Sequence, residues 1–417
     1  MSEQKSRDRA LDFLKAVAIL LVVCFHNVQL NPASIADSIF MLLCGAAVPC
    51  FFLVSGALFF RQRFSMEKHI RRTIRFYLVM VAWRIIYLLI YHHLGAPLSG
   101  SLRPLLSYLF LFQSLDGVET SHFWFMDAML TVMLLAPVLK LCMDEHRKLA
   151  YYLMALMFLF NQLVADGNLL FALIARLTGK GPWEVSAFAE ISPFSFRYSN
   201  YMLYYMLGAV LMEYQEKRMT ICQEPQRTKC REPRLAESPS TKLHGLRHHP
   251  LLTPCLMMAA GLGGLVLIKY LQSGTFRWQG LHITSAYYWV STMLLACGMF
   301  LLVTQNWNRW ICPAGQTLRK HSAPAEPTPQ EQIDHAGQTP RKRFCPLVWF
   351  ADTVGTSTLG IFYLHIPLIF LLRPVLFEPL SQYNGWLLNL VESLLVVRIA
   401  CWIIWIGRKI PGGKRLF

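Results

Sequence analysis

Two ionisable side chains lie inside the first apolar stretch of the chain, LDFLKAVAILLVVCFHNVQL, at residues 11–30. Lys15 and His26 are eleven residues apart, so on an α-helix they would be separated by about 16 Å along the axis and by about 20° around it. A cation and an imidazole on one helix face can hold an anionic group at one end and transfer a proton at the other. The structural alternative is that Lys15 reaches the lipid headgroups and His26 bonds to a neighbouring helix.

A basic pair follows in the segment RQRFSMEKHIRRTIRFY, at residues 61–77. Arg72 and Arg75 lie one helical turn apart, which predicts a fork of guanidinium groups for the phosphates of a ligand. The alternative is the ordinary excess of positive charge in cytoplasmic loops.

Two further histidines lie in apolar segments, SHFWFMDAMLTVMLLAPVL at 121–139 and STLGIFYLHIPLIFLLR at 357–373. In the topology predicted below, His122 and His365 fall at the same depth as His26, toward the outer face. We therefore expect three imidazoles to converge on one acid–base site, although any one of them could be a structural hydrogen-bonding group.

We expect the other charged residues in the apolar stretches, and one tryptophan, to have structural rather than catalytic roles. Arg84, Glu392 and Arg398 are expected to form an Arg–Glu pair that holds helices together. Trp124 is expected to be an interfacial anchor rather than a platform for a substrate.

The composition predicts a polytopic, all-α membrane protein. Of the 417 residues, 54% are hydrophobic and only 15% are charged, and apolar runs of helix-spanning length recur along the whole chain. The first run is followed by others and has no small-residue cleavage site, so it is not a signal peptide. The net charge of +16 does not indicate nucleic-acid binding, because the basic residues fall mostly in short loops that orient a membrane protein.

We predict one membrane domain over 1–417 with about ten transmembrane helices. The expected spans are 11–30, 38–60, 76–94, 122–143, 149–165, 201–214, 251–271, 285–304, 348–372 and 385–406. Most of the 40 Lys and Arg residues fall in alternate loops, which places both termini in the cytoplasm. The stretch 105–115 is too short to cross and is predicted to be re-entrant or interfacial.

The loops carry further predictions. Two polar, Pro-rich cytoplasmic loops, 216–249 and 312–346, are expected to be disordered. The outer segment 165–200 is expected to recognise an acceptor, with interfacial anchoring as the equally weighted alternative for its aromatic residues. The aromatic candidates for stacking on sugar rings are Trp183, Phe194, Phe196 and Tyr198.

Five motifs in this order resemble the acyltransferase 3 family of integral membrane acyltransferases. They are Lys15 and His26 with ten residues between them, VPCFFLVSGALFF at 48–60, the Arg72 and Arg75 pair, HFWFMDAML and LGIFYLHIPL. The likeness runs from about residue 8 to 406. Within the family it is greatest to the surface-polysaccharide O-acetyltransferases, the branch of the enterobacterial common antigen O-acetyltransferase.

The resemblance implies a ten-helix enzyme of the bacterial inner membrane. Such enzymes move an acyl group, usually acetyl from cytoplasmic acetyl-CoA, to a sugar hydroxyl of a polysaccharide or lipid-linked glycan at the outer face. Acetyl-CoA would be the cosubstrate, with no metal, and the partners would be the glycan and membrane lipids but no nucleic acid. Lys15 fills a position where Arg is common and lacks the planar fork of Arg. We expect no esterase-like domain after the last span, and the oligomeric state stays open, a homodimer included.

These residues give an expected mechanism. Arg72 and Arg75 would bind the phosphates of acetyl-CoA, and Lys15 would lie near the pantetheine arm, which would reach up a polar shaft. His26 would act as general base toward the acceptor hydroxyl or would itself carry the acyl group. The oxyanion donor would be His122, His365 or Arg84, and His122 and His365 are counted with Lys15 and His26 as the catalytic set.

The main alternative outside this class is a secondary transporter, in which the buried charges would be proton or substrate sites. No repeat relates 11–214 to 251–406, so the two related halves typical of transporters are not found. Within the family, succinyl transfer and acetylation of peptidoglycan are alternatives to acetylation of a surface glycan.

Overall fold

The computed structural model describes residues 7–27, 34–95, 101–179, 198–228, 250–273, 287–311, 345–383 and 385–416. Within these ranges every regular element is helical, which confirms the all-α class. The main helices are α1 (Arg9–His26), α2 (Ile35–Cys44), α3 (Ala47–Phe60), α4 (Met66–His93), α5 (Leu102–Leu111), α6 (Trp124–Asp144), α7 (Arg147–Met157), α8 (Val164–Thr178), α10 (Ser199–Thr228), α11 (Leu252–Ser273), α12 (Val290–Ile311), α14 (Pro346–Thr353), α15 (Thr358–Leu372) and α16 (Trp386–Gly407).

Each predicted span overlaps one or more helices, although several bounds differ: the span 149–165 lies in a continuous helical stretch that runs from Arg147 to Thr178. Eight helical segments of the described chain are long and apolar enough to cross a membrane. The other two predicted spans, 11–30 and 201–214, correspond to α1 and α10. Both helices carry several charged residues, such as Asp12 and Lys15 in α1, which lowers their hydropathy without preventing a helix. The chain is therefore a multi-pass membrane protein.

Two predicted spans are interrupted by short breaks. The span 38–60 is divided between α2 and α3 at Gly45 and Ala46, and the span 348–372 between α14 and α15 at 354–357. At the second break Gly355 lies against α1, where a Cβ atom would come within 2.2 Å of the Asp12 carbonyl oxygen. A close approach of this kind requires glycine.

The predicted re-entrant stretch agrees with the structure in its length, whereas one predicted loop begins later than expected. The stretch 105–115 contributes to α5, a helix of ten residues, which is too short to cross. The predicted loop 216–249 begins later than expected, because α10 continues to Thr228. Residues 229–249 and 312–344 lie outside the described residues.

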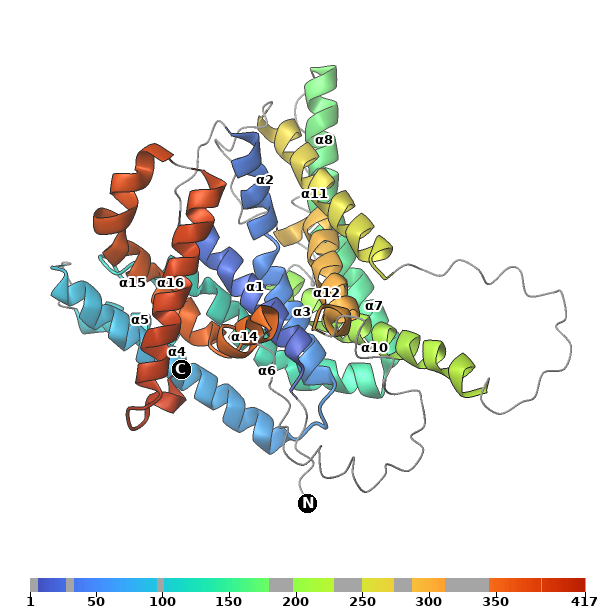
Figure 1. Cartoon of the computed structure of the whole chain (residues 1–417), viewed down its shortest axis with the longest axis horizontal. Helices are drawn as coiled ribbons and strands as arrows, with labels where there is room; N and C mark the ends of the chain where they lie inside the picture. The colour runs from blue at the N-terminus through green and yellow to red at the C-terminus, as the bar shows by residue number, and fades with distance from the viewer. Residues whose placement is uncertain are drawn as a thin grey trace, which may run out of the picture.

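Helix α1 runs through the centre of the molecule (Figure 1). It contacts α3, α12, α14, α15 and α16, and nearly all of its residues from Leu14 to Cys24 are buried or half-buried. Helices α15 and α16 lie on one side of α1 in Figure 1, and α11 and α12 lie on the other. A central position explains how α1 can present polar groups to the interior rather than to lipid.

The N-terminus lies beside the segment that joins α3 to α4, and the C-terminal tail lies beside α4 itself. Arg61 forms an ion pair with Asp8 at 2.9 Å, and the Arg75 guanidinium donates to the Lys414 carbonyl oxygen at 3.3 Å. The N-terminus therefore lies near the start of α4, and the C-terminal tail extends along α4 as far as Trp83, whose indole N–H donates to the Leu416 carbonyl oxygen at 3.4 Å. The cytoplasmic placement of both termini stays a prediction.

Helices α3 and α10 pack with their backbones in close contact at two glycines. A Cβ atom on Gly56 would lie 1.7 Å from the Tyr205 carbonyl oxygen, and one on Gly208 would lie 2.0 Å from that of Leu53. Small residues at such positions let transmembrane helices approach closely and gain van der Waals contact.

We expect Gly56→Ala to destabilise the protein by about 2 kcal/mol, because the added methyl group forces the α3 and α10 backbones apart. The measurement is the apparent melting temperature of the purified protein in detergent. Gly263→Ala is the matched control, because a Cβ atom there meets nothing within 4 Å. Equal melting temperatures for the two variants would contradict the close approach of α3 and α10.

Candidate active site

The three predicted histidines converge on one site. The His26 ring lies 5.1 Å from that of His365 and 6.3 Å from that of His122, and the last two rings are 5.4 Å apart, measured between centroids. They come from the end of α1, the single 3₁₀ turn before α6 and the middle of α15. The tertiary structure thus joins residues that are far apart in sequence.

Hydrogen bonds fix the tautomer of His122. The Tyr87 hydroxyl lies 2.7 Å from the Tyr363 carbonyl oxygen, which can only accept, so the hydroxyl donates its proton there. The same hydroxyl oxygen is 3.1 Å from His122 Nε2 and therefore accepts from that nitrogen. His122 Nε2 carries the hydrogen, and Nδ1 keeps a buried lone pair that no described residue engages.

His365 is fixed in the opposite tautomer. Its Nδ1 atom lies 2.5 Å from the Phe362 carbonyl oxygen, so Nδ1 is the donor. Its Nε2 atom is buried and has no hydrogen-bond partner among the described residues. His122 and His365 therefore each retain one free lone pair. An imidazole that gains a proton next to free lone pairs can be stabilised by them, which suits His26 to the role of proton acceptor.

Most of the N–H groups of the three expected oxyanion donors bond to other partners. The N–H groups of His122 and His365 bond to Tyr87 and Phe362, as described above. Arg84 donates to three backbone carbonyl oxygens at the end of α5, at 2.9 to 3.1 Å. Arg84 Nε is buried and has no hydrogen-bond partner among the described residues, so Arg84 keeps one donor and its predicted role at the oxyanion stays untested. The Ser121 hydroxyl, which lines the site, is a donor that the sequence analysis did not identify.

His26 and His122 line a cavity of about 280 Å³ between α1, α3 and α6. His365 is completely buried and lies behind them. Trp124 also lines this cavity, and its ring packs 5.6 Å from those of Tyr201 and Tyr287. Trp124 is half-buried and faces this cavity, and its predicted role as an interfacial anchor stays untested. In the described structure, no three His, Cys, Asp or Glu side chains are arranged to hold a metal ion.

Helix α16 holds the end of α1 in place next to His26. The Asn27 amide donates to the Glu392 carboxylate at 2.9 Å, and the Asn389 amide donates to the backbone carbonyl oxygens of Cys24 and Asn27. These bonds satisfy carbonyl groups that the helix end leaves unpaired. Glu392 therefore pairs with an amide on α1, and the expected Arg–Glu pair is wrong.

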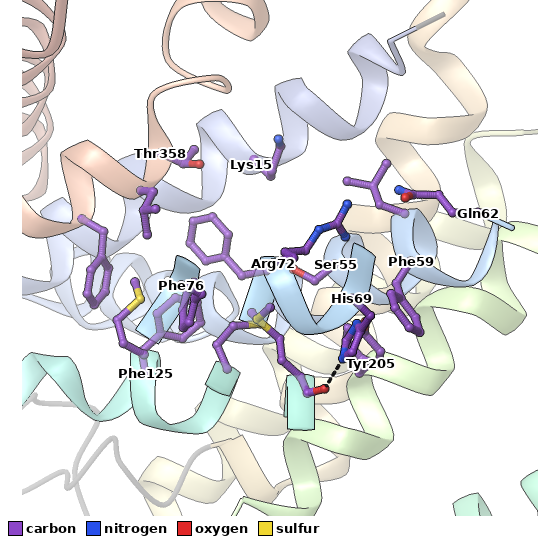
Figure 2. A pocket seen from close by; sticks show the side chains of 17 residues that line it. Lys15, Ser55, Phe59, Gln62, His69, Arg72, Phe76, Phe125, Tyr205 and Thr358 are labelled. Atoms are coloured by element: carbon purple, nitrogen blue, oxygen red, sulfur yellow. Dashed lines mark hydrogen bonds between the residues drawn. The ribbon is translucent and has the colours of Figure 1, made fainter. Parts of the chain in front are cut away.

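A second cavity, of about 390 Å³, lies near the chain ends and carries positive charge (Figure 2). Lys15 reaches it from α1 and Arg72 from α4, together with His69 and Gln62. Lys15 Nζ is 2.7 Å from the Asp12 carboxylate, whereas the Arg72 guanidinium makes no ion pair with a described residue. Arg72 is thus the main unneutralised cation of this cavity.

Arg75 does not share this cavity. It lies one helical turn after Arg72 on α4, is exposed, and donates to the carbonyl oxygen of Lys414. The structure therefore separates the two predicted phosphate ligands, because the helical rotation of three residues points Arg75 at the C-terminal tail. The sequence alone gave both residues the same weight.

Three phenylalanines separate the two cavities. Phe51, Phe125 and Phe362 line both of them, and the Phe125 ring lies 5.6 Å from that of Phe51 and 5.2 Å from that of Phe362. The expected polar shaft is wrong at this point, because an apolar wall interrupts the path from Lys15 to His26. These aromatic residues belong to uniformly apolar runs, so no sequence signal distinguished them.

A comparison with models of protein families shows the family of the chain. The model of the acyltransferase domain of the acyltransferase 3 family matches residues 8–406, which is almost the whole chain. The chain belongs to the acyltransferase 3 family. Neither a curated protein nor a solved structure matches it. The protein is therefore a membrane acyltransferase, and the transporter alternative is set aside.

Some predicted acceptor-binding residues of this acyltransferase stay untested. Trp183, Phe194 and Phe196 lie outside the described residues. Tyr198 is described and lines a hollow between α5 and α6. Tyr87 was missed by the sequence analysis, although its position three residues after Arg84 puts it on the same inward face of α4.

Proposed function

We propose that this acyltransferase moves an acetyl group from cytoplasmic acetyl-CoA to a sugar hydroxyl of a surface polysaccharide or of its lipid-linked precursor. It would reside in the bacterial inner membrane and belong to the surface-polysaccharide branch of its family. One observation carries the proposal: α1 presents Lys15 to a cationic cavity and His26 to a histidine cluster, so one helix links an anion site to a proton-transfer site.

The cationic cavity suits the phosphates of a coenzyme A thioester. Guanidinium groups form strong, charge-assisted hydrogen bonds with phosphate, and Arg72, which lines the cavity, would form them. Arg75, at the exposed surface one turn further on, would contribute only to parts of the coenzyme outside the cavity. Lys15, held by Asp12, would lie along the pantetheine arm.

The arm must then pass the wall of Phe51, Phe125 and Phe362 to reach His26. About 16 Å separates Lys15 from His26 along α1, which is on the order of the length of an extended pantetheine arm. In our proposal the three rings move apart when the arm enters, and they keep water from the histidines when it is absent. Exclusion of water would protect the thioester from hydrolysis.

At the histidine cluster His26 would take the proton of the acceptor hydroxyl as its oxygen attacks the thioester carbonyl carbon. The tetrahedral intermediate would collapse by breaking the C–S bond, and the proton on His26 would pass to the leaving thiolate. The products are the O-acetyl ester and free coenzyme A. The lone pairs of His122 Nδ1 and His365 Nε2 would stabilise the transient imidazolium of His26.

A second version places the acyl group on His26 itself. The imidazole would attack the thioester and release coenzyme A, and the acceptor hydroxyl would then attack the acyl-imidazole. The half-buried His26 faces the cavity, as this version also requires. Ping-pong kinetics would distinguish it from direct transfer.

The test is mass spectrometry of surface glycans from cells with and without the intact gene, together with transfer from labelled acetyl-CoA to those glycans by the purified protein. We expect alkali-labile acetyl groups to disappear from a surface glycan when the gene is lost. Two results together would contradict the proposal: the purified, folded protein labels no glycan, and loss of the gene leaves the acetylation of the surface glycans unchanged.

A further inference from the structure

A polar cavity of about 590 Å³ adjoins the histidine cavity. Ser121 and Trp124 line both cavities, so the two cavities are direct neighbours. The polar cavity is formed by the segment 112–121 between α5 and α6, and by the outer part of α4. Its volume lies in the range of sites that hold small molecules.

The segment between α5 and α6 is built as a shaped loop. Phe112 ends α5 in the left-handed conformation, and Leu115 and Val118 pair across a turn at Gly117, which has a φ of 81°. The Glu119 carboxylate accepts a hydrogen bond from the Ser121 backbone N–H at 2.8 Å. These contacts fix the loop against the turn that carries His122.

The lining of this cavity is negatively charged. Three of its residues are carboxylates, Asp116, Glu119 and Asp127, and among its described residues Arg84 is the only cation. The Arg84 guanidinium is bound to carbonyl oxygens and stacks on the Tyr108 and Phe112 rings at about 5 Å. If the charge of Arg84 neutralises one of the three carboxylates, the ionised lining still has a net charge of −2.

Two features besides charge point to a ligand. The cavity joins Trp124, whose flat apolar ring can lie against a sugar ring, to side chains that accept hydrogen bonds from hydroxyl groups. Next to it, the His122 Nδ1 atom is buried, and no described residue bonds to it. A hydroxyl group that enters from the polar cavity would therefore meet several hydrogen-bond acceptors, of which His122 Nδ1 has no partner among the described residues.

We propose that this cavity is the acceptor site and that it takes a sugar without negative charge, either neutral or amino-bearing. The inference rests on the proposed function and adds to it the charge class of the acceptor. Carboxylates bind neutral hydroxyl groups and ammonium groups well, whereas they repel uronic acids and phosphorylated sugars. Like charges placed together discriminate strongly against the wrong partner.

The experiment uses the purified full-length chain in lipid nanodiscs with labelled acetyl-CoA and two small acceptors, phenyl glucuronide and phenyl glucuronamide. They have the same size and the same hydroxyl groups, and they differ only in the charge of one group. We expect the uncharged amide to be acetylated with a kcat/KM about tenfold higher than that of the acid.

A variant without two of the cavity's carboxylates tests whether these carboxylates cause the preference for the amide over the acid. Asp116→Asn with Glu119→Gln keeps the size of both side chains, and we expect it to raise kcat/KM for the acid and to reduce the preference to about twofold. Glu145→Gln is the matched control, because Glu145 is an exposed carboxylate at the far end of α6. It removes a charge outside the cavity and should leave the preference unchanged.

Each outcome is decisive for the acceptor assignment. Equal use of both acceptors, preference for the acid, or a preference that the double variant does not change would overturn it. Absence of transfer to the amide would also overturn it, if glycan extracted from cells is still acetylated. Absence of transfer to the extracted glycan as well would overturn the proposed function itself, so the two failures can be told apart.

Discussion

Replacement of His26 by Gln is expected to reduce acyl transfer by about 10²–10⁴-fold, the usual effect of losing a positioned general base. The amide can still form hydrogen bonds but cannot take up a proton. The side chain lines the histidine cavity and makes none of the hydrogen bonds that join α1 to α16, which run through Asn27 and Asn389. The variant should therefore fold normally.

Acyl transfer from labelled acetyl-CoA to extracted glycan is the measurement, with the melting temperature as a check on folding. His93→Gln is the matched control, since His93 is exposed at the end of α4. It should retain full activity. Transfer by correctly inserted His26→Gln protein at the rate of the unchanged protein would rule out both the general-base and the acyl-histidine versions of the mechanism.

Replacement of Arg72 by Ala is expected to raise the KM for acetyl-CoA about ten- to 100-fold, because a hydrogen bond between charged groups contributes about 1.5–3 kcal/mol. The turnover number should change much less, since Arg72 is far from the histidines. Arg75→Ala changes a residue that lies outside the cavity and bonds only to a backbone carbonyl oxygen. Its effect on KM should stay within about twofold, as for most surface substitutions.

The comparison between the two arginines decides how acetyl-CoA is held. The measurement for both variants is the KM for acetyl-CoA, or the affinity for acetyl-CoA determined by titration. Equal weakening by Arg72→Ala and Arg75→Ala would restore the paired fork expected from sequence and would show that the tail at Lys414 moves away on binding. Unchanged affinity in both would remove the phosphate assignment.

Hydrophobic patterning was sufficient to predict the helices. Spans of this length must satisfy their backbone hydrogen bonds internally in a membrane, so each long apolar run predicts a helix. The interruptions were not predictable, because the break before α15 depends on how closely Gly355 approaches α1, a residue remote in sequence. The extension of α10 to Thr228 was not predictable either, because the residues after 214 are polar and give no apolar pattern.

The helical period also correctly placed Lys15 and His26 on the same inward face of α1. An ionisable residue in an apolar run has to face the interior of the bundle, so the sequence could name His122 and His365 as partners. It could not give the tautomers, because these depend on Tyr87 and on carbonyl oxygens of α15 that only the folded chain brings near.

The sequence by itself determined the class of the protein, its helices and the three histidines that meet in the candidate site, because periodicity and the cost of burying charge are local properties. Only the tertiary structure decided which groups meet. It separated Arg72 from Arg75, placed Glu392 on Asn27, and set Phe51, Phe125 and Phe362 between the two cavities. Apolar runs contain many phenylalanines, and their sequence positions do not show which rings will close a path between packed helices.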